Sequence, residues 1–261
     1  MDFNYREYRL GILSHLSEYK NNVLKIKKNG MDTRYKKEYS HILPKGNEYR
    51  NIIHSEYGME LWDLIKKFKI KLHKEFHHLN SSQALCFNLF YPIIKENRFD
   101  LLLEKNENII GWEFEFVPDK KEKTNFDVFI QTNENNYFFE LKYTEDKFSS
   151  KKITETSLER FKNIYEIKME KFNNVTSEIF LKNYQVFRNL SYIDNGIINF
   201  VIPKTRSDLN IELNEIIKKY CNNVLKQRIN IIYIEDIVNK AISQKKLEEY
   251  YKLLSEKYVN K

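Results

Sequence analysis

Residues 125–144, NFDVFIQTNENNYFFELKYT, give the clearest indication of how this chain folds. Two segments rich in aromatic and β-branched residues flank the polar run Thr132 to Asn136, and this pattern is typical of a β-hairpin. Side chains alternate between the two faces of a strand, so we expect Glu140 and Lys142 on the same face of the second strand. Asp127, on the first strand, is expected to face them across the hairpin.

Two carboxylates beside an ammonium group suit a hard divalent cation. Mg²⁺ prefers oxygen ligands and keeps several waters when it binds a protein. We therefore predict that Asp127, Glu140 and the backbone carbonyl of Leu141 bind Mg²⁺, with Mn²⁺ as an alternative, while Lys142 orients or activates an attacking water. A metal ion there would polarise a phosphate and stabilise its developing charge. The pattern predicts hydrolysis of a phosphodiester bond.

The Glu-x-Lys spacing by itself is not specific. It recurs at Glu18 and Lys20, Glu145 and Lys147, and Glu166 and Lys168. The copy at Glu140 and Lys142 differs because it lies in an apolar strand that follows another strand with an aspartate. The alternative interpretation is that charged residues occur at these strand ends by chance.

The hairpin resembles the PD-(D/E)xK nuclease superfamily, in which a strand aspartate, a turn and Glu-x-Lys on the next strand follow one another. FDVFI supplies the aspartate and FFELK the second half. The segment HHLNSSQALCFNLF at residues 77–90, together with ELKYTE and YQVFRNL, is similar to a bacterial restriction-endonuclease-like family within that superfamily. The resemblance spans residues 43–237. It departs from the usual pattern because Phe126, rather than proline, precedes Asp127.

The resemblance implies an α/β fold with a restriction-endonuclease-like core, in which helices flank a central mixed β-sheet behind an N-terminal helical region. It implies a DNA endonuclease of bacterial defence that cuts double-stranded DNA as a homodimer. It also implies that Gln185 faces the active site as a catalytic residue, and that Gln83, Arg188 and Asn189 contact the substrate. For these residues the alternative is a helix-surface amide or an internal hydrogen bond.

A further carboxylate is often part of such sites. Glu113 and Glu115 alternate with the aromatic residues of WEFEF (112–116), so we expect both acids on one face of the strand and the three aromatic rings on the other. Glu60 and Glu75, on a preceding helix, are the alternatives. The sequence does not rank these four acids.

Three regions are expected along the chain: an N-terminal helical region (1–79), the nuclease core (80–242) and a C-terminal helix (243–261). Strands alternate with helices in the second half, which predicts an α/β core. The expected helices cover residues 5–28, 59–78, 154–193 and 209–225. A further helix is expected to begin at a cap formed by Asn80, Ser81 or Ser82 and to run to Lys95, with a kink or an end at Pro92. The expected strands cover residues 109–117, 126–131, 137–143, 197–202 and 229–234.

Composition excludes several classes of protein. The 261 residues, 41% of them hydrophobic, are enough for one substantial core. Cys86 and Cys221 lie in predicted helices and have neither metal-site spacing nor the number needed for a disulfide framework. No segment approaches the roughly 20 apolar residues of a membrane span, and the first ten residues lack an apolar signal core. We expect a cytoplasmic protein with no membrane partner.

The net charge of +7 is compatible with a polyanionic partner. Five lysines crowd residues 66–74, where phosphate contact and a solvated helix face are equally good interpretations. Two alternatives to the restriction-type nuclease stay open. One is a nuclease that acts on branched DNA or RNA in repair or processing, and the other is a non-catalytic nucleic-acid-binding protein with the same fold.

Overall fold

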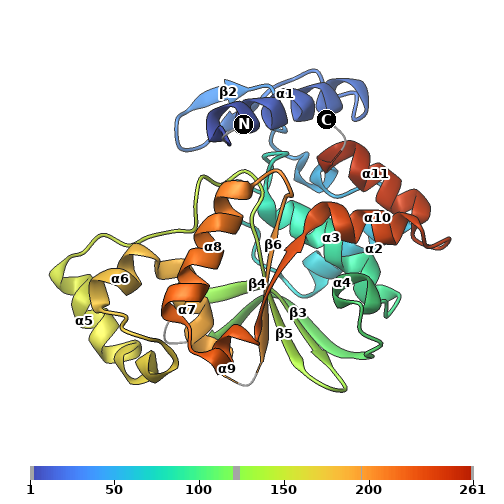
Figure 1. Cartoon of the computed structure of the whole chain (residues 1–261). Coiled ribbons are helices and arrows are strands. Elements are labelled where there is room, and N and C mark those ends of the chain that lie inside the picture. The colour runs from blue at the N-terminus through green and yellow to red at the C-terminus, as the bar shows by residue number, and fades with distance from the viewer. Residues whose placement is uncertain (1–2, 120–123, 195, 260–261) are drawn as a thin grey trace.

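A five-stranded mixed sheet forms the centre of the molecule in the computed structural model, which describes residues 3–119, 124–194 and 196–259. Its strands are adjacent in chain order (Figure 1): β3 (Ile109–Asp119), β4 (Thr124–Thr132), β5 (Asn136–Leu141), β6 (Ile197–Ile202) and β7 (Ile229–Tyr233). The first three strands pair in antiparallel fashion, whereas β6 pairs with β5, and β7 with β6, in parallel. The expected mixed sheet of a restriction-endonuclease-like fold is confirmed.

The predicted hairpin is formed by β4 and β5. Val128 pairs with Phe139, so Asp127 and Glu140 lie opposite each other at the next position of this antiparallel pair. The turn is held by the hydroxyl of Thr132, which accepts hydrogen bonds from the backbone N–H groups of residues 134 and 135. Such local bonds explain why a short polar run can end one strand and start the next.

Helices cover both faces of the sheet (Figure 1). On one face a hydrophobic cluster joins the sheet to α3 (Ser82–Lys95), α10 (Ile234–Ile242) and α11 (Glu248–Tyr258). On the other face a second cluster joins it to α7 (Tyr184–Tyr192) and α8 (Ser207–Tyr220). β5 serves both clusters because its side chains alternate: Phe139 packs into the first and Phe138 into the second.

Helix α3 begins and ends where the sequence predicted. Ser81 is the N-cap, and its hydroxyl accepts a hydrogen bond from the N–H of Ala84. Pro92 neither ends the helix nor leaves a buried carbonyl without a donor. A proline cannot donate to the carbonyl four residues earlier, which is that of Asn88, and the hydroxyl of Tyr250 donates to this carbonyl instead, at 3.1 Å.

The N-terminal region is less helical than predicted. It contains α1 (Tyr5–Asn22), the two-stranded β1 (Gly30–Asp32) and β2 (Lys37–Tyr39), the 3₁₀ turn η1 (Glu48–Asn51) and α2 (Glu56–Lys67). The helix expected at 59–78 ends early because Lys69 adopts a left-handed backbone, with φ of 51°, and the N–H of Ile70 bonds to the carbonyl of Ile65. The last three lysines of residues 66–74 therefore lie beyond the helix.

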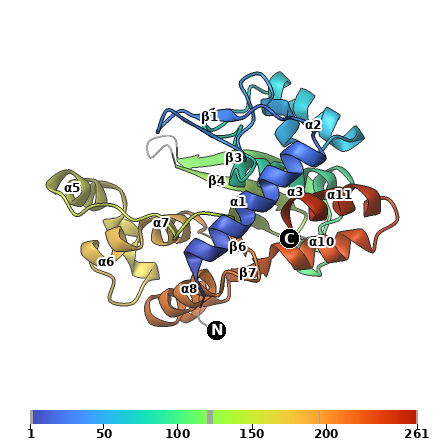
Figure 2. The same ribbon diagram turned by 90° about the horizontal axis from the view of Figure 1, so that it is seen from above.

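The remaining elements complete the helical layers: α4 (Asp100–Leu103), α5 (Glu155–Ile164), the 3₁₀ helix η2 (Glu166–Lys171), α6 (Ser177–Lys182) and α9 (Asn223–Lys226). The region expected as one helical stretch at 154–193 is thus four short helices. Cys86 lies in α3 as predicted, but Cys221 follows α8 rather than lying within a helix; both thiols are buried and free. No helix among the described residues is long and apolar enough to cross a membrane. Figure 2 shows α1 lying across the molecule next to α11.

Candidate active site

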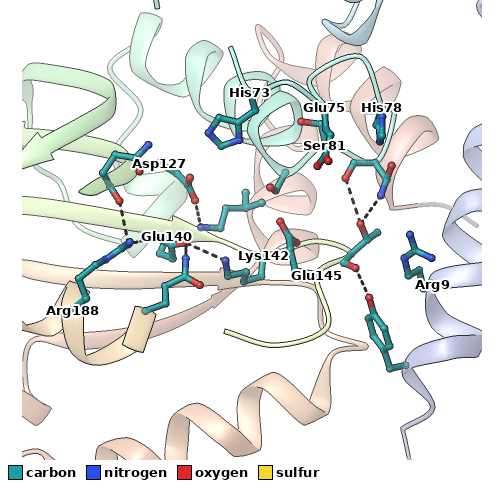
Figure 3. Close-up of a pocket in the computed structure, with 17 residues that line it drawn as sticks. Arg9, His73, Glu75, His78, Ser81, Asp127, Glu140, Lys142, Glu145 and Arg188 are labelled. Carbon is teal, nitrogen blue, oxygen red and sulfur yellow. Dashed lines mark hydrogen bonds and ion pairs between the residues drawn. The ribbon is translucent and has the colours of Figure 1, made fainter. Parts of the chain in front are cut away.

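A pocket of about 410 Å³ opens beside the β4–β5 hairpin (Figure 3). Its wall contains Asp127, Glu140, Lys142, Gln185 and Arg188. The structure therefore brings together residues from β4, from β5 and the segment after it, and from α7, which lies more than 40 positions further along the chain. Their proposed roles remain predictions.

The carboxylates of Asp127 and Glu140 face each other across the hairpin. One oxygen of Asp127 accepts a hydrogen bond from the N–H of Leu141, at 2.7 Å. Burial and the nearby carboxylates of Glu140 and Glu115 raise the pKa of Asp127 well above its ordinary value. The open end of the β4–β5 hairpin therefore concentrates negative charge, which the N–H of Leu141 only partly offsets.

The carboxylate of Glu140 is buried and held from several sides. Its Oε1 atom lies 2.5 Å from Nε2 of Gln185 and 3.3 Å from Nζ of Lys142. Its Oε2 atom lies 2.9 Å from Nδ2 of Asn189 and 3.9 Å from Nη2 of Arg188. Gln185 and Asn189 are four residues apart, so both amides point from one face of α7. Their contacts fix the orientation of the carboxylate.

Lys142 is 7% exposed and keeps its charge. Burial alone would lower the pKa of its ammonium group, but the carboxylates of Glu140, Glu145 and Asp127 outweigh burial and raise the pKa above its ordinary value. At neutral pH Lys142 therefore acts as a hydrogen-bond donor and a positive charge.

Of the four acids that the sequence left unranked, Glu115 comes closest to the hairpin carboxylates. It lies across β3–β4 from Asp127, and its backbone adopts a left-handed conformation with φ of 56°. Its Oε1 accepts from Nε2 of Gln83 at 2.7 Å, and its Oε2 accepts from the amide of Asn125 and lies 3.5 Å from Nε2 of His73. A non-glycine residue with this backbone is uncommon and costs about 1–3 kcal/mol, but eight of the described residues adopt it, so the conformation by itself does not mark a functional residue.

The other three acids are less favourably placed. Glu113 is exposed on β3, Glu60 pairs with Lys95 at 2.8 Å, and Glu75 lines the pocket from the segment after α2. The expectation that the aromatic residues of 112–116 share one face is wrong for the last ring. The left-handed backbone of Glu115 turns the strand, so Phe114 packs into the first hydrophobic cluster and Phe116 against the second.

Two predicted substrate contacts point into the protein. The amide of Gln83 donates to Glu115 and to the carbonyl of Lys71, and its oxygen accepts from the N–H of His73. Asn189 lies between Glu140 and Arg188, whose Nη2 donates to its amide oxygen at 2.6 Å. In this geometry both amides position charged groups, and direct contact with substrate stays a prediction.

The donor set suits a hard cation, although the metal site itself remains a prediction. Within the described parts of the chain no three His, Cys, Asp or Glu side chains converge as a ligand group. The predicted set is smaller, with carboxylate oxygens from Asp127 and Glu140 and a carbonyl oxygen from Leu141, and Mg²⁺ usually completes such sets with water. Burial first, and then the carboxylates of Glu140 and Glu115, raise the pKa of Asp127, and a divalent cation at this position would offset that negative charge.

Side chains from distant elements hold the segment that follows Lys142. The hydroxyl of Tyr8 donates to the carbonyl of residue 143 at 2.9 Å, and that of Tyr5 to the carbonyl of residue 144 at 2.9 Å. The fully buried guanidinium of Arg206 donates to the carbonyls of residues 145 and 146, at 2.6 Å each. Helix α1 and Arg206 therefore fix four successive carbonyls directly after the candidate catalytic lysine.

Sequence reasoning missed several residues of this site. Asn125 lies two positions before Asp127, so strand alternation was a usable signal for placing it on the same face. His73, which pairs with Glu115, follows the early end of α2 and had no such signal. Tyr5 and Arg9 line the pocket from α1, and nothing in their local sequence indicates a contact across more than 110 positions.

A mixed sheet with helices on both faces, and paired carboxylates on neighbouring strands followed by a buried lysine, define a restriction-endonuclease-like protein. Comparison with protein families agrees: the model of the family described as "Restriction Endonuclease associating with ARP" matches residues 13–259, and the chain belongs to this family. No curated protein and no solved structure matches the chain.

Proposed function

We propose that this protein is a metal-dependent endonuclease that hydrolyses phosphodiester bonds of DNA in restriction-type bacterial defence. The convergence of Asp127, Glu140 and Lys142 on one pocket carries the proposal. Membership of a restriction-endonuclease family supports nuclease activity. The metal requirement, the DNA substrate and the defensive role are the proposed parts.

Asp127, Glu140 and the backbone carbonyl of Leu141 would hold Mg²⁺ or Mn²⁺. A bound cation of this kind supplies Lewis-acid polarisation of the phosphate and a more acidic water. Glu140 would bind it while Gln185 and Asn189 keep the carboxylate oriented through their amide groups. Asp127 has to be ionised to act as a ligand, so its raised pKa links metal affinity to pH.

Lys142 and Arg188 would act on the phosphate and the attacking water. Because the pKa of Lys142 is raised, its ammonium group orients the water by hydrogen bonding and stabilises the negative charge that develops on the phosphate. Arg188 lines the pocket, donates to the carbonyl of Asn125 at 3.3 Å and is held by Asn189. Its Nε and Nη2 both donate to Asn189, so Nη1 is the nitrogen proposed to meet a phosphate oxygen.

Assembly forms a second part of the proposal. Each strand of a duplex needs an active site of its own, and two copies of the chain supply two such sites. We therefore propose a homodimer on double-stranded DNA. The family is described as associating with ARP, and we propose that this chain also works with such a partner. The molar mass of the purified protein, alone and with duplex DNA, measured by light scattering, tests the dimer.

The test of activity compares wild type with Glu140→Gln on plasmid and linear duplex, each with Mg²⁺ and with EDTA. Glu134→Gln is the matched control, since Glu134 lies exposed in the turn of the same hairpin. We expect fragments only with Mg²⁺, from wild type and the control, and none from Glu140→Gln. Branched DNA, single-stranded DNA and RNA are digested in parallel. If only one of these is cleaved, it replaces duplex DNA as the proposed substrate. Cleavage by Glu140→Gln at the rate of wild type would refute the site.

A further inference from the structure

A second pocket, of about 460 Å³, lies where the segment after Lys142 enters α5. Three cationic side chains line it, those of Lys151, Lys152 and Arg160. None of the eleven described residues that form its wall is acidic, and four of them are serine or threonine. The volume falls within the roughly 300–1,000 Å³ of small-molecule sites. Cations and hydroxyl groups together suit a phosphate-bearing ligand.

This second pocket adjoins the candidate active site through α7. Gln185 belongs to the wall of the first pocket, and the preceding residue, Tyr184, to the wall of the second. Nε2 of Gln185 donates to Glu140, while its Oε1 accepts from the N–H of Ser149 at 3.0 Å. The next residue, Ser150, already lines the second pocket. One amide thus joins the candidate catalytic carboxylate to the rim of the second pocket.

The wall of the second pocket is held in place before any ligand arrives. The N–H of Lys151 bonds to the carbonyl of Leu181 at 2.8 Å, which ties the rim to α6. The hydroxyl of Tyr184 lies 3.2 Å from that of Tyr165, and its ring centre lies 5.1 Å from Nζ of Lys151. Tyr184 is only 7% exposed and Lys151 lies over its ring, so the ring supports the ammonium group of this lysine, which is left to meet a phosphate.

We propose that the second pocket binds a nucleotide of the substrate strand next to the cleaved bond, with Lys151 and Lys152 on its phosphate. The proposal rests on the proposed nuclease function, because the strand is taken to pass through the first pocket. A free nucleotide offers the same chemistry, so the experiment separates the two sources.

The experiment measures binding of a fluorescently labelled duplex oligonucleotide by anisotropy, in EDTA so that no cleavage occurs. It compares wild type with Lys151→Glu/Lys152→Glu and with the milder Lys151→Gln/Lys152→Gln. The control is Lys218→Glu/Lys219→Glu, because these exposed lysines on α8 give the same change in net charge away from both pockets. Unlabelled deoxynucleoside monophosphate is added as a competitor in a separate arm.

We expect the glutamate pair at 151 and 152 to bind on the order of tenfold or more weakly, and the glutamine pair to change less but in the same direction. The dependence of affinity on salt should weaken by roughly one unit of slope for each phosphate that the variant no longer binds. If the variants at 151 and 152 bind the duplex as tightly as the control variant, the inference is overturned, whatever effect they have on competition by the free nucleotide. Wild type that binds but never cleaves would refute the nuclease function and leave this binding result standing.

Discussion

At the residue scale, the site is a balance of buried charges. Asp127, Glu140 and Glu115 concentrate negative charge, and burial raises the pKa of Asp127. The ammonium of Lys142 and the guanidinium of Arg188 lie on the side of Glu140, at 3.3 and 3.9 Å. The two hairpin carboxylates therefore differ, since Glu140 is held by cations and amides whereas Asp127 accepts a hydrogen bond from the backbone N–H of Leu141. The negative charge of Asp127 is therefore less offset by neighbouring groups than that of Glu140, so a bound cation would stabilise Asp127 more.

Glu115 gives the first prediction at this scale. Replacing it with glutamine removes one negative charge beside Asp127 but keeps hydrogen-bonding groups for Gln83 and Asn125. If this carboxylate helps to hold the cation or its waters, the rate of Mg²⁺-dependent cleavage should fall by about tenfold or more. Single-turnover cleavage measures the change.

The matched control is Glu113→Gln, because Glu113 lies two positions earlier on the same strand but is exposed. Its cleavage rate should stay within about twofold of wild type, as is usual for a surface substitution. Equal rates for both variants would exclude Glu115 from the site and leave Glu75 as the next acid to test.

At the element scale, α1 serves the active site as well as the core. Tyr5 and Tyr8 of this helix, together with the buried Arg206, hold successive carbonyls after Lys142. The guanidinium of Arg206 also lies 5.3 Å from the ring centre of Tyr5 and 5.4 Å from that of Tyr8, so one cation links both tyrosines. An N-terminal helix remote in sequence thereby determines the path of the chain beyond β5.

The double substitution Tyr5→Phe/Tyr8→Phe tests this role of α1. It keeps both rings against Arg206 and removes two hydrogen bonds, each contributing about 1 kcal/mol to stability. We expect a lower turnover number with little change in the affinity for DNA, because the segment after Lys142 is no longer anchored to the helix. The turnover number is measured by cleavage with DNA in excess over protein, and the affinity by binding in EDTA.

Tyr251→Phe is the control for reduced stability. Its hydroxyl donates to the carbonyl of Leu89 at 2.5 Å, in the core far along the chain from Lys142. This variant should be less stable yet keep its turnover number below the unfolding temperature. If the α1 variant also kept its turnover number, the helix would have only a structural role.

At the scale of the whole molecule, the N-terminal region packs against the helices of the core, because α1, α2, α3 and α11 share one hydrophobic cluster. Within the N-terminal region, the backbone of residues 41–43 pairs with that of residues 77–79. His41 is buried where these two segments pair, and its ring lies 6.1 Å from that of His78. Burial lowers the pKa of His41 to about 4, so the folded chain keeps this ring neutral.

This pKa predicts how the stability of the whole fold depends on pH. An unfolded histidine has a pKa near 6.5, so between about pH 6.5 and pH 4 the side chain of His41 binds a proton in the unfolded chain but not in the folded chain. The stability contributed by neutral His41 is present above pH 6.5 and decreases as pH falls towards 4. The decrease amounts to at most about 3 kcal/mol.

Urea unfolding at several pH values measures this effect. Relative to wild type, His41→Leu should have a flatter dependence of unfolding free energy on pH between 4 and 6.5. His54→Leu serves as the control, since His54 is exposed and meets water in both states. A slope for His41→Leu as steep as that of wild type would mean that other groups dominate acid unfolding.

The strands of the central sheet, the β4–β5 hairpin, the capped helix α3 and the juxtaposition of Asp127 with Glu140 could all be predicted from the amino-acid sequence. These features depend on local patterns, namely alternation along strands, turn residues and a helix cap, and a single chain carries such patterns in full. Tertiary packing was needed for the left-handed turn at Glu115, the early end of α2 and the hydrogen bonds from α1 to the segment after Lys142. That Gln185 of α7 faces the site was implied only by the family resemblance, and its contact with Glu140 comes from tertiary packing. Each of these arises from contacts between elements distant in sequence, whose packing overrides local preference and which no local pattern encodes.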